Sequence, residues 1–159
     1  MVDSLFTKNG LKKLAKEIEE LEVKIKDLQS QVAHAAETGG DQWHDNFSYE
    51  SLTNEIRGLD RHLFEKNQLL KNYVLVYPPK RFNKVAIGCC VTINRNGGKE
   101  NWQIVGFGES DPTNHTIAYN TPLASSIMDK KKGDKVNVEI VGRKTMIEIL
   151  DIKKGEGIC

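Results

Sequence analysis

The sequence has little cysteine, no long apolar run and no excess of charge of one sign. Its three cysteines are the adjacent Cys89 and Cys90 and the terminal Cys159. That spacing gives neither a C-x-x-C metal motif nor the disulfide framework of a small secreted protein. No apolar stretch approaches the roughly 18 residues of a transmembrane helix, and residues 1–6 lack the basic and apolar regions of a signal peptide. We therefore expect a cytoplasmic protein with no membrane partner.

The net charge of +1 is unevenly divided along the 159 residues. Residues 1–77 hold 10 Lys/Arg against 13 Asp/Glu, and residues 78–159 hold 13 against 9. An acidic first part joined to a basic second part argues against a protein that simply coats nucleic acid, because such a protein is basic throughout.

Two segments of the first part carry apolar residues at heptad spacing. They are Leu11, Leu14, Ile18, Leu21, Ile25, Leu28 and Val32 in the first segment, and Leu52, Ile56, Leu59, Leu63 and Leu70 in the second, with Lys66 interrupting. A 3.5-residue period predicts helices with one narrow apolar seam, and a short connector makes two such helices pair antiparallel. At 1.5 Å per residue, arms of roughly 30 residues give a hairpin about 45 Å long.

The ends of these helices follow from local signals. Thr7 is a candidate N-cap of the first helix, and Gly39-Gly40 ends that helix near Thr38. The return helix is expected to run from Asp45 or Asn46 to about Tyr73, with Gly58 weakening it by about 1 kcal/mol relative to alanine.

Beyond Pro78-Pro79 the pattern changes from heptads to strands, because a proline forces the residue before it out of helical geometry. The expected strands are Val85–Asn94, Trp102–Gly108, Thr116–Asn120, Lys135–Gly142 and Thr145–Ile152, with a short helix from Pro122 to Met128. The sequence thus predicts an α+β protein: a coiled-coil hairpin over residues 1–77 with an acidic tip at 39–46, and a small domain over residues 80–159.

The hairpin tip carries the residues with the clearest potential for chemistry. Asp41 and Asp45 are expected either to be solvated capping acids or to contribute to a divalent metal site completed by a partner. Trp43 is expected either to stack on a partner or to fold back over Phe47. For His44, a solvated loop histidine is favoured over a proton carrier. An autonomous metal site at Asp41, His44 and Asp45 is disfavoured, because nothing supports the ligands from behind.

Two groups of cations lie elsewhere. Arg57, Arg61 and Lys66 on the return helix alternate with acids, which favours an ion-paired surface over contacts to RNA phosphates. Lys130-Lys131-Lys132 before Gly133 is either a solvated turn or a contact for an acidic partner.

Several motifs, taken in order, resemble those of the bacterial Gre transcript-cleavage factors. They are Thr7-Lys8-Asn9-Gly10-Leu11 at the start, Trp102-Gln103-Ile104-Val105-Gly106, then Thr121-Pro122-Leu123-Ala124 and Lys132-Gly133-Asp134. The resemblance covers nearly the whole chain. It implies that residues 80–159 have an FKBP-like fold without a prolyl isomerase site and dock on RNA polymerase, while the hairpin enters the secondary channel.

The same resemblance implies a role for the tip. Asp41 and Asp45 would hold a second Mg²⁺ jointly with the polymerase, near the RNA 3′ end, so that a water attacks the backtracked transcript. The protein would then be an accessory factor for the polymerase's own RNA cleavage, with no metal held alone and no enzyme activity of its own.

The tip departs from the family pattern Gly-Asp-x-x-Glu-Asn. Here Asp45 replaces the glutamate, and one extra residue separates it from Asp41. A misplacement of about 1 Å can cost roughly 100-fold in catalysis, so an alternative is a channel-binding regulator that inhibits or modulates the polymerase without cleavage. A dimerisation coiled coil is disfavoured because the two arms satisfy each other in one chain, and we expect a monomer.

Overall fold

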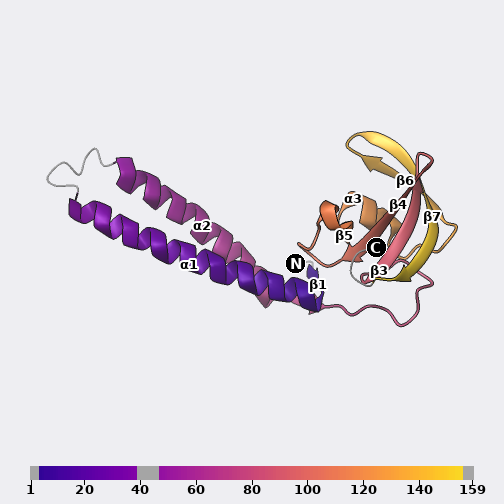
Figure 1. The fold of residues 1–159 in the computed structure, drawn as a ribbon, viewed down its shortest axis with the longest axis horizontal. Coiled ribbons are helices and arrows are strands. Elements are labelled where there is room, and N and C mark those ends of the chain that lie inside the picture. The colour runs from indigo at the N-terminus through magenta and orange to yellow at the C-terminus, as the bar shows by residue number, and fades with distance from the viewer. Residues whose placement is uncertain (1–3, 39–46, 156–159) are drawn as a thin grey trace. The chain divides into compact units, whose positions relative to one another are not determined.

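The computed structural model describes residues 4–38 and 47–155. The chain divides into two compact units (Figure 1). One consists of Leu11–Tyr73, which we call the hairpin unit. The other consists of Met1–Gly10 together with Val74–Cys159, which we call the sheet unit. The expected α+β fold class, with a helical first part and a strand-rich second part, is confirmed.

The helices and strands follow one another along the chain. They are β1 (Ser4–Phe6), α1 (Lys8–Thr38), α2 (Phe47–Lys71), β2 (Tyr73–Leu75), β3 (Cys89–Arg95), β4 (Gly98–Val105), the 3₁₀ helix η2 (Pro112–Asn114), β5 (Thr116–Ala118), α3 (Pro122–Ile127), β6 (Lys135–Ile140) and β7 (Arg143–Lys154).

The heptad seam of the first helix is the buried stripe of the hairpin unit. Leu14, Ile18, Ile25 and Leu28 of α1 are all less than 9% exposed. The seam residues of α2 are half-buried, and no residue of that helix is fully buried. A single narrow apolar seam between α1 and α2 therefore holds the hairpin unit together, as a heptad pattern predicts.

Ion pairs between the two helices fix their antiparallel pairing. Lys66 Nζ lies 2.6 Å from Glu17 Oε2, and Lys24 Nζ lies 2.9 Å from Glu55 Oε1. Figure 1 shows the two helices running side by side. Lys66, which interrupts the apolar pattern of α2, is 28% exposed in its side chain. Its pairing with Glu17 explains why the interruption is tolerated.

The sheet unit is built on a five-stranded sheet of order β5-β4-β3-β7-β6. All neighbouring strands are antiparallel except β4 and β5. One face of the sheet packs on α3 to form the core, which includes Val91, Ile93, Ile104, Ile127, Ile147 and Ile149. A register shift between Thr92 and Ile93 marks a β-bulge in β7, after which Ile152 returns to the buried face.

The expected strand Val85–Asn94 is half wrong. Val85 and Ile87 are buried, but β3 begins only at Cys89. Val85 instead bonds to the segment after α3: its N–H donates to Lys130 O at 2.9 Å, and its carbonyl accepts from Asp129 N at 2.9 Å. Gly88, with φ of +92°, then breaks the extended geometry. The alternating apolar residues of segment 85–88 are therefore buried, but the segment is irregular and not a strand.

Residues 4–10 group with the sheet unit, whereas the sequence analysis placed them with the hairpin in residues 1–77. Phe6 is 1% exposed, and its ring centroid lies 5.6 Å from that of Phe107. Phe107 N–H donates to Leu5 O, and Val76 N–H donates to Phe6 O, both at 2.8 Å. The strands β1 and β2, which the sequence did not predict, pair with each other. Burial of Phe6 thus assigns the start of the chain to the sheet unit.

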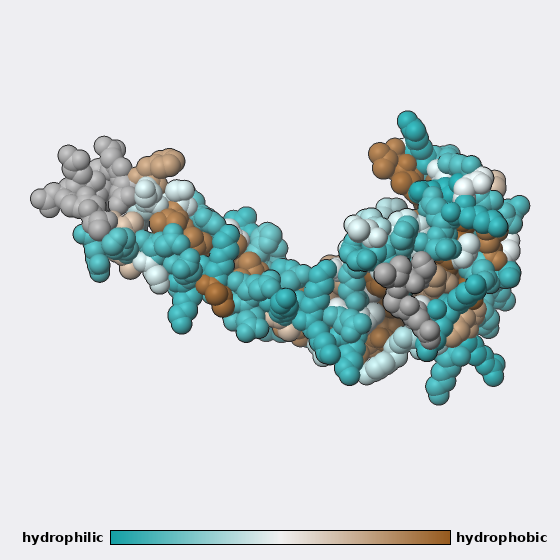
Figure 2. Space-filling view, viewed as in Figure 1, coloured by the Kyte–Doolittle hydropathy of each residue, from teal (hydrophilic) through white to brown (hydrophobic). Residues whose placement is uncertain are grey.

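Both units present mainly hydrophilic residues on the face shown in Figure 2, with isolated apolar patches. None of the helices in the described part of the chain has the length and hydropathy to cross a bilayer.

Candidate functional site

The acidic tip falls outside the described residues. Asp41 and Asp45, and with them Trp43 and His44, lie in the segment between the end of α1 at Thr38 and the start of α2 at Phe47. Phe47 itself is 81% exposed. Glu50 lies in the first turn of α2, where a carboxylate interacts favourably with the helix dipole.

No alternative metal centre is found in residues 4–38 and 47–155. Within these ranges no group of three or more His, Cys, Asp or Glu side chains is placed to hold an ion. The expectation of a metal therefore depends on Asp41 and Asp45 alone.

The cations of the return helix have two different environments. Lys66 is engaged with Glu17 across the hairpin, so it serves the pairing of the helices. Arg57 and Arg61 are exposed on α2. The structure thus favours the ion-paired interpretation for Lys66 and leaves two arginines on the surface.

Two of the motifs that resemble the Gre factors, Thr7–Leu11 and Trp102–Gly106, meet at Glu109. The Thr7 hydroxyl donates to the Glu109 carboxylate, with both oxygens 2.7 Å away, and Gly106 N–H donates to Glu109 Oε2 at 2.9 Å. Gly10 N–H donates to Thr7 Oγ1 at 3.0 Å, which confirms Thr7 as the N-cap of α1. Sequence reasoning missed Glu109, because only its contacts with residues distant in the chain distinguish it from a surface acid.

Both glycines of these motifs lie against that carboxylate. A Cβ on Gly10 would lie 2.7 Å from Glu109 Cδ. A Cβ on Gly106 would lie 2.5 Å from Glu109 Oε2 and 2.8 Å from Thr7 N. The spacing Thr-x-x-Gly at the start of the chain and the glycine after β4 therefore belong to one structural feature.

The third motif adjoins the second through β5. Val105 pairs with Ala118 in parallel register, and the Thr121 hydroxyl donates to Ala118 O at 2.8 Å. Thr121 also caps α3, since its Oγ1 accepts from Ala124 N at 3.3 Å, with Pro122 in the first turn. The motifs Trp102–Gly106 and Thr121–Ala124 thus meet at the end of β4 and β5.

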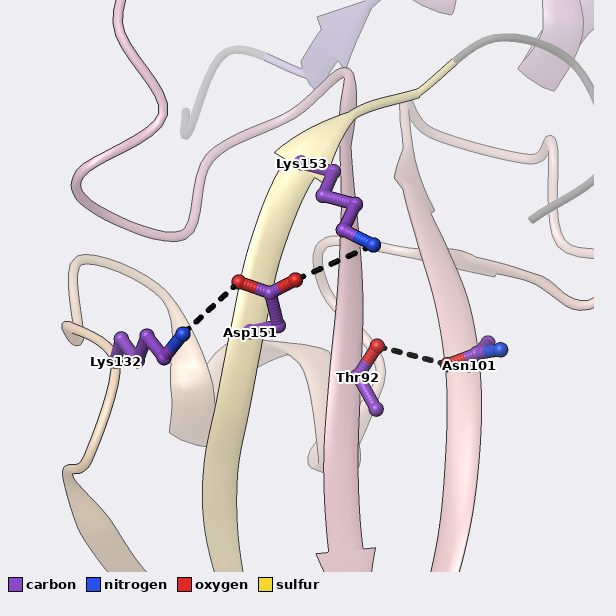
Figure 3. Close-up of polar contacts among 5 residues, drawn as sticks. All are labelled: Thr92, Asn101, Lys132, Asp151 and Lys153. Carbon is purple, nitrogen blue, oxygen red and sulfur yellow. Dashed lines mark hydrogen bonds and ion pairs between the residues drawn. The ribbon is translucent and has the colours of Figure 1, made fainter.

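The outer face of the sheet carries a row of polar contacts (Figure 3). Asp151 lies between two lysines, with Lys132 Nζ 3.4 Å from Oδ1 and Lys153 Nζ 3.4 Å from Oδ2. On the neighbouring strands the Thr92 hydroxyl donates to Asn101 Oδ1 at 2.8 Å. Desolvation acts to raise the pKa of Asp151, but the hydrogen bonds from Lys153 and Lys132 outweigh it and lower that pKa. Lys132 of the basic turn is therefore already ion-paired within the sheet unit.

A cavity of about 570 Å³ lies in the sheet unit beside the Glu109 cluster. Its lining includes Thr7, Lys8, Tyr77, Gln103 and Glu109. The described residues around it include no histidine, cysteine or serine. The only carboxylate in the lining, Glu109, is already engaged with Thr7 and Gly106.

Comparison with known proteins gives a consistent assignment. Residues 79–154 match the family described as "Transcription elongation factor, GreA/GreB, C-term". The chain is 30% identical over 154 residues to the transcription elongation factor GreA of Thermoanaerobacter pseudethanolicus, covering 94% of this chain and 97% of that protein. It is 33% identical over 142 residues to GreA of Mycoplasmoides gallisepticum, covering 87% of each.

Among solved structures, the GreA factor homolog 1 (Gfh1) of Thermus thermophilus is 16% identical, with a TM-score of 0.46, and covers 95% of this chain and 99% of that one. At that level the likeness adds nothing to the assignment. The helical hairpin and the α+β unit, matched over nearly their whole length by GreA proteins, define a transcription elongation factor. The chain belongs to the GreA/GreB family.

Proposed function

We propose that this protein binds RNA polymerase at its secondary channel and stimulates the polymerase to cleave backtracked RNA. The observation that carries the proposal is the 30% identity to GreA over 94% of the chain. The antiparallel hairpin supports it, because both acids lie in the connection between the two helices. The protein is then an accessory factor, and it acts as a monomer.

The chemistry of the tip follows from its donor set. Asp41 and Asp45 supply carboxylate oxygens, the ligands that Mg²⁺ prefers, and Mg²⁺ often takes only one or two protein carboxylates beside waters and phosphates. When bound jointly with the polymerase near the RNA 3′ end, the ion would activate a water for attack on a phosphodiester. In this proposal the two aspartates supply negative charge at the tip, and the hairpin positions their carboxylates near the reacting RNA.

The sheet unit supplies the docking surface in this proposal. Its resemblance to the family lies in Trp102–Gly106 and Thr121–Ala124, which adjoin each other at the end of β4 and β5. The hairpin unit supplies reach, since its seam and interhelical ion pairs make two long helices into one rod-like element.

A second candidate function is a channel-binding regulator without cleavage activity. The observation that favours it is the tip spacing, in which one extra residue and a shorter acid replace the usual arrangement. An aspartate places its carboxylate one methylene closer to the backbone than a glutamate does, so the extra residue either compensates for the shorter reach or misdirects the carboxylate.

The test is an RNA cleavage assay on backtracked elongation complexes with purified polymerase. Asp41→Asn and Asp45→Asn should each reduce stimulated cleavage at least about 100-fold while leaving polymerase affinity nearly unchanged. Asn keeps the size and one acceptor oxygen of Asp but removes the charge that balances a divalent ion. Asp60→Asn, which removes an exposed acid from α2, is the matched control and should cleave normally. Cleavage that survives the double change Asp41→Asn/Asp45→Asn would refute the tip mechanism.

One further variant separates the two candidate functions. Deleting Gln42 and changing Asp45→Glu restores the family's spacing and reach. If this variant stimulates cleavage and the unchanged protein does not, the protein is a regulator without cleavage activity.

A further inference from the structure

Two hairpins of the sheet unit turn with the same backbone geometry but with different residues. The β3–β4 turn is Asn96-Gly97, with φ of +54° and +84°, closed by the pair Arg95 and Gly98. The β6–β7 turn is Val141-Gly142, with φ of +50° and +71°, closed by Ile140 and Arg143. Both are two-residue turns with positive φ at both positions, for which Asn-Gly is a preferred sequence.

Valine is among the least suitable residues for the first position of such a turn. A β-branched side chain at positive φ is strained, at a cost of order 1 kcal/mol or more. The other non-glycine residues at positive φ in the described ranges are Asn96, His115 and Asp129, types that tolerate this region. Val141 is also 96% exposed, so packing against the described residues does not offset the strain.

The surroundings of Val141 combine apolar and cationic side chains. Met146, on the same hairpin, is 58% exposed, and Figure 2 shows brown atoms at the end of the β6–β7 hairpin. Arg143 and Lys144 are exposed, and neither forms an ion pair within the described residues. Glu139 lies opposite Lys144 in register, so the two cations are faced by one acid on the partner strand. We call Val141, Arg143, Lys144 and Met146 the β6–β7 tip.

We propose that the β6–β7 tip is a docking point of the sheet unit on RNA polymerase, with Val141 inserting into an apolar pocket bordered by carboxylates. The side chain of Val141, strained and exposed in the free protein, is buried in the complex, where an apolar anchor contributes most. Arg143 and Lys144 require acids around the pocket and favour association through charge complementarity. The inference rests on the proposed polymerase binding.

The test exchanges the residues of the two turns in the full chain. Val141→Asn should raise the melting temperature, because Asn tolerates positive φ, and should weaken binding to core RNA polymerase by at least about tenfold. Asn96→Val, the matched control, places the same strained side chain on the neighbouring turn. It should lower the melting temperature and leave polymerase affinity unchanged. Arg143→Glu should weaken binding and reduce its dependence on salt.

The outcomes separate this inference from the function on which it rests. If the unchanged protein fails to bind polymerase, the proposed function is wrong. If it binds, and Val141→Asn binds equally well while melting at a higher temperature, the docking point is wrong and polymerase binding stands. Binding of the unchanged protein to phosphatidylserine vesicles that Val141→Asn loses, with unaltered polymerase affinity, would overturn the inference in favour of a lipid surface.

Discussion

At the scale of single residues, Glu109 connects parts of the chain that lie far apart in sequence. Its carboxylate accepts from Thr7, 102 positions away, and from Gly106, three positions away. The half-buried carboxylate thus serves both the N-cap of α1 and the backbone after β4. This arrangement gives a physical reason for the two glycines that the family-like motifs contain.

Gly106→Ala should destabilise the sheet unit by about 1–3 kcal/mol, because the added methyl group overpacks a close backbone contact. Its Cβ would lie 2.8 Å from Thr7 N and 3.1 Å from Leu5 O, and backbone atoms cannot move aside as a flexible side chain can. Urea unfolding followed by tryptophan fluorescence measures the change. Gly98→Ala, at the other end of β4, would meet Arg95 O at 3.5 Å and should be nearly neutral. Equal stability of the two variants would disprove the packing argument.

At the scale of elements, the hairpin was the part most completely predictable from sequence. The heptad spacing predicts the two helices, their apolar seam and their antiparallel pairing together. Thr7 and the glycines at 39–40 mark the expected ends of the first helix. The strands were predicted less well. Residues 85–88 have the alternation of a strand, but Val85 bonds to Asp129 and Lys130 after α3. The strands β1 and β2 are too short for any periodicity to reveal them.

The functional residues divide in the same way. Asp41 and Asp45 were found from sequence because a motif marks them, and their roles stay predictions since they lie outside the described residues. Glu109 and Val141 carry no motif. One is identified by contacts across 102 residues, the other by a backbone angle and an exposed fraction, which only a three-dimensional structure provides.

Gly58→Ala should stabilise the hairpin unit by about 1 kcal/mol, the difference in helix propensity between the two residues. Nothing lies within 4 Å of the position that an added Cβ would take, so the methyl group fits without strain. Thermal unfolding by far-UV circular dichroism measures the gain. The same substitution at Gly133, where φ is +89°, should destabilise the protein. A loss of stability at position 58 would contradict this prediction, because it would mean that the added methyl group does not fit the folded hairpin unit.

At the scale of the whole molecule, the hairpin unit is inserted between two segments of the sheet unit. A variant in which a short Gly/Ser linker replaces Leu11–Tyr73 should therefore fold and compete with the full chain for RNA polymerase, without stimulating cleavage. A fragment that starts at residue 78 lacks Phe6 and Thr7 and should be less stable, because it exposes the site of Phe6 and removes the donor to Glu109. Competition binding on core polymerase compares the two. A folded linker variant that does not compete would contradict docking through the sheet unit.

The bond between Thr7 and Glu109 also has a consequence for how the chain folds as it is synthesised. The hairpin unit is complete once residue 73 has emerged, and its contacts are local, so it can form early. The Phe6 ring and the Thr7 hydroxyl must wait for Phe107 and Glu109, about a hundred positions later, which at 5–20 residues per second takes about 5–20 s. During that interval the apolar side chain of Phe6 has no site to occupy. The segment of Phe6 and Thr7 is made before the hairpin unit but is among the last to reach its native place, and newly made chains expose it to proteases and chaperones in the meantime.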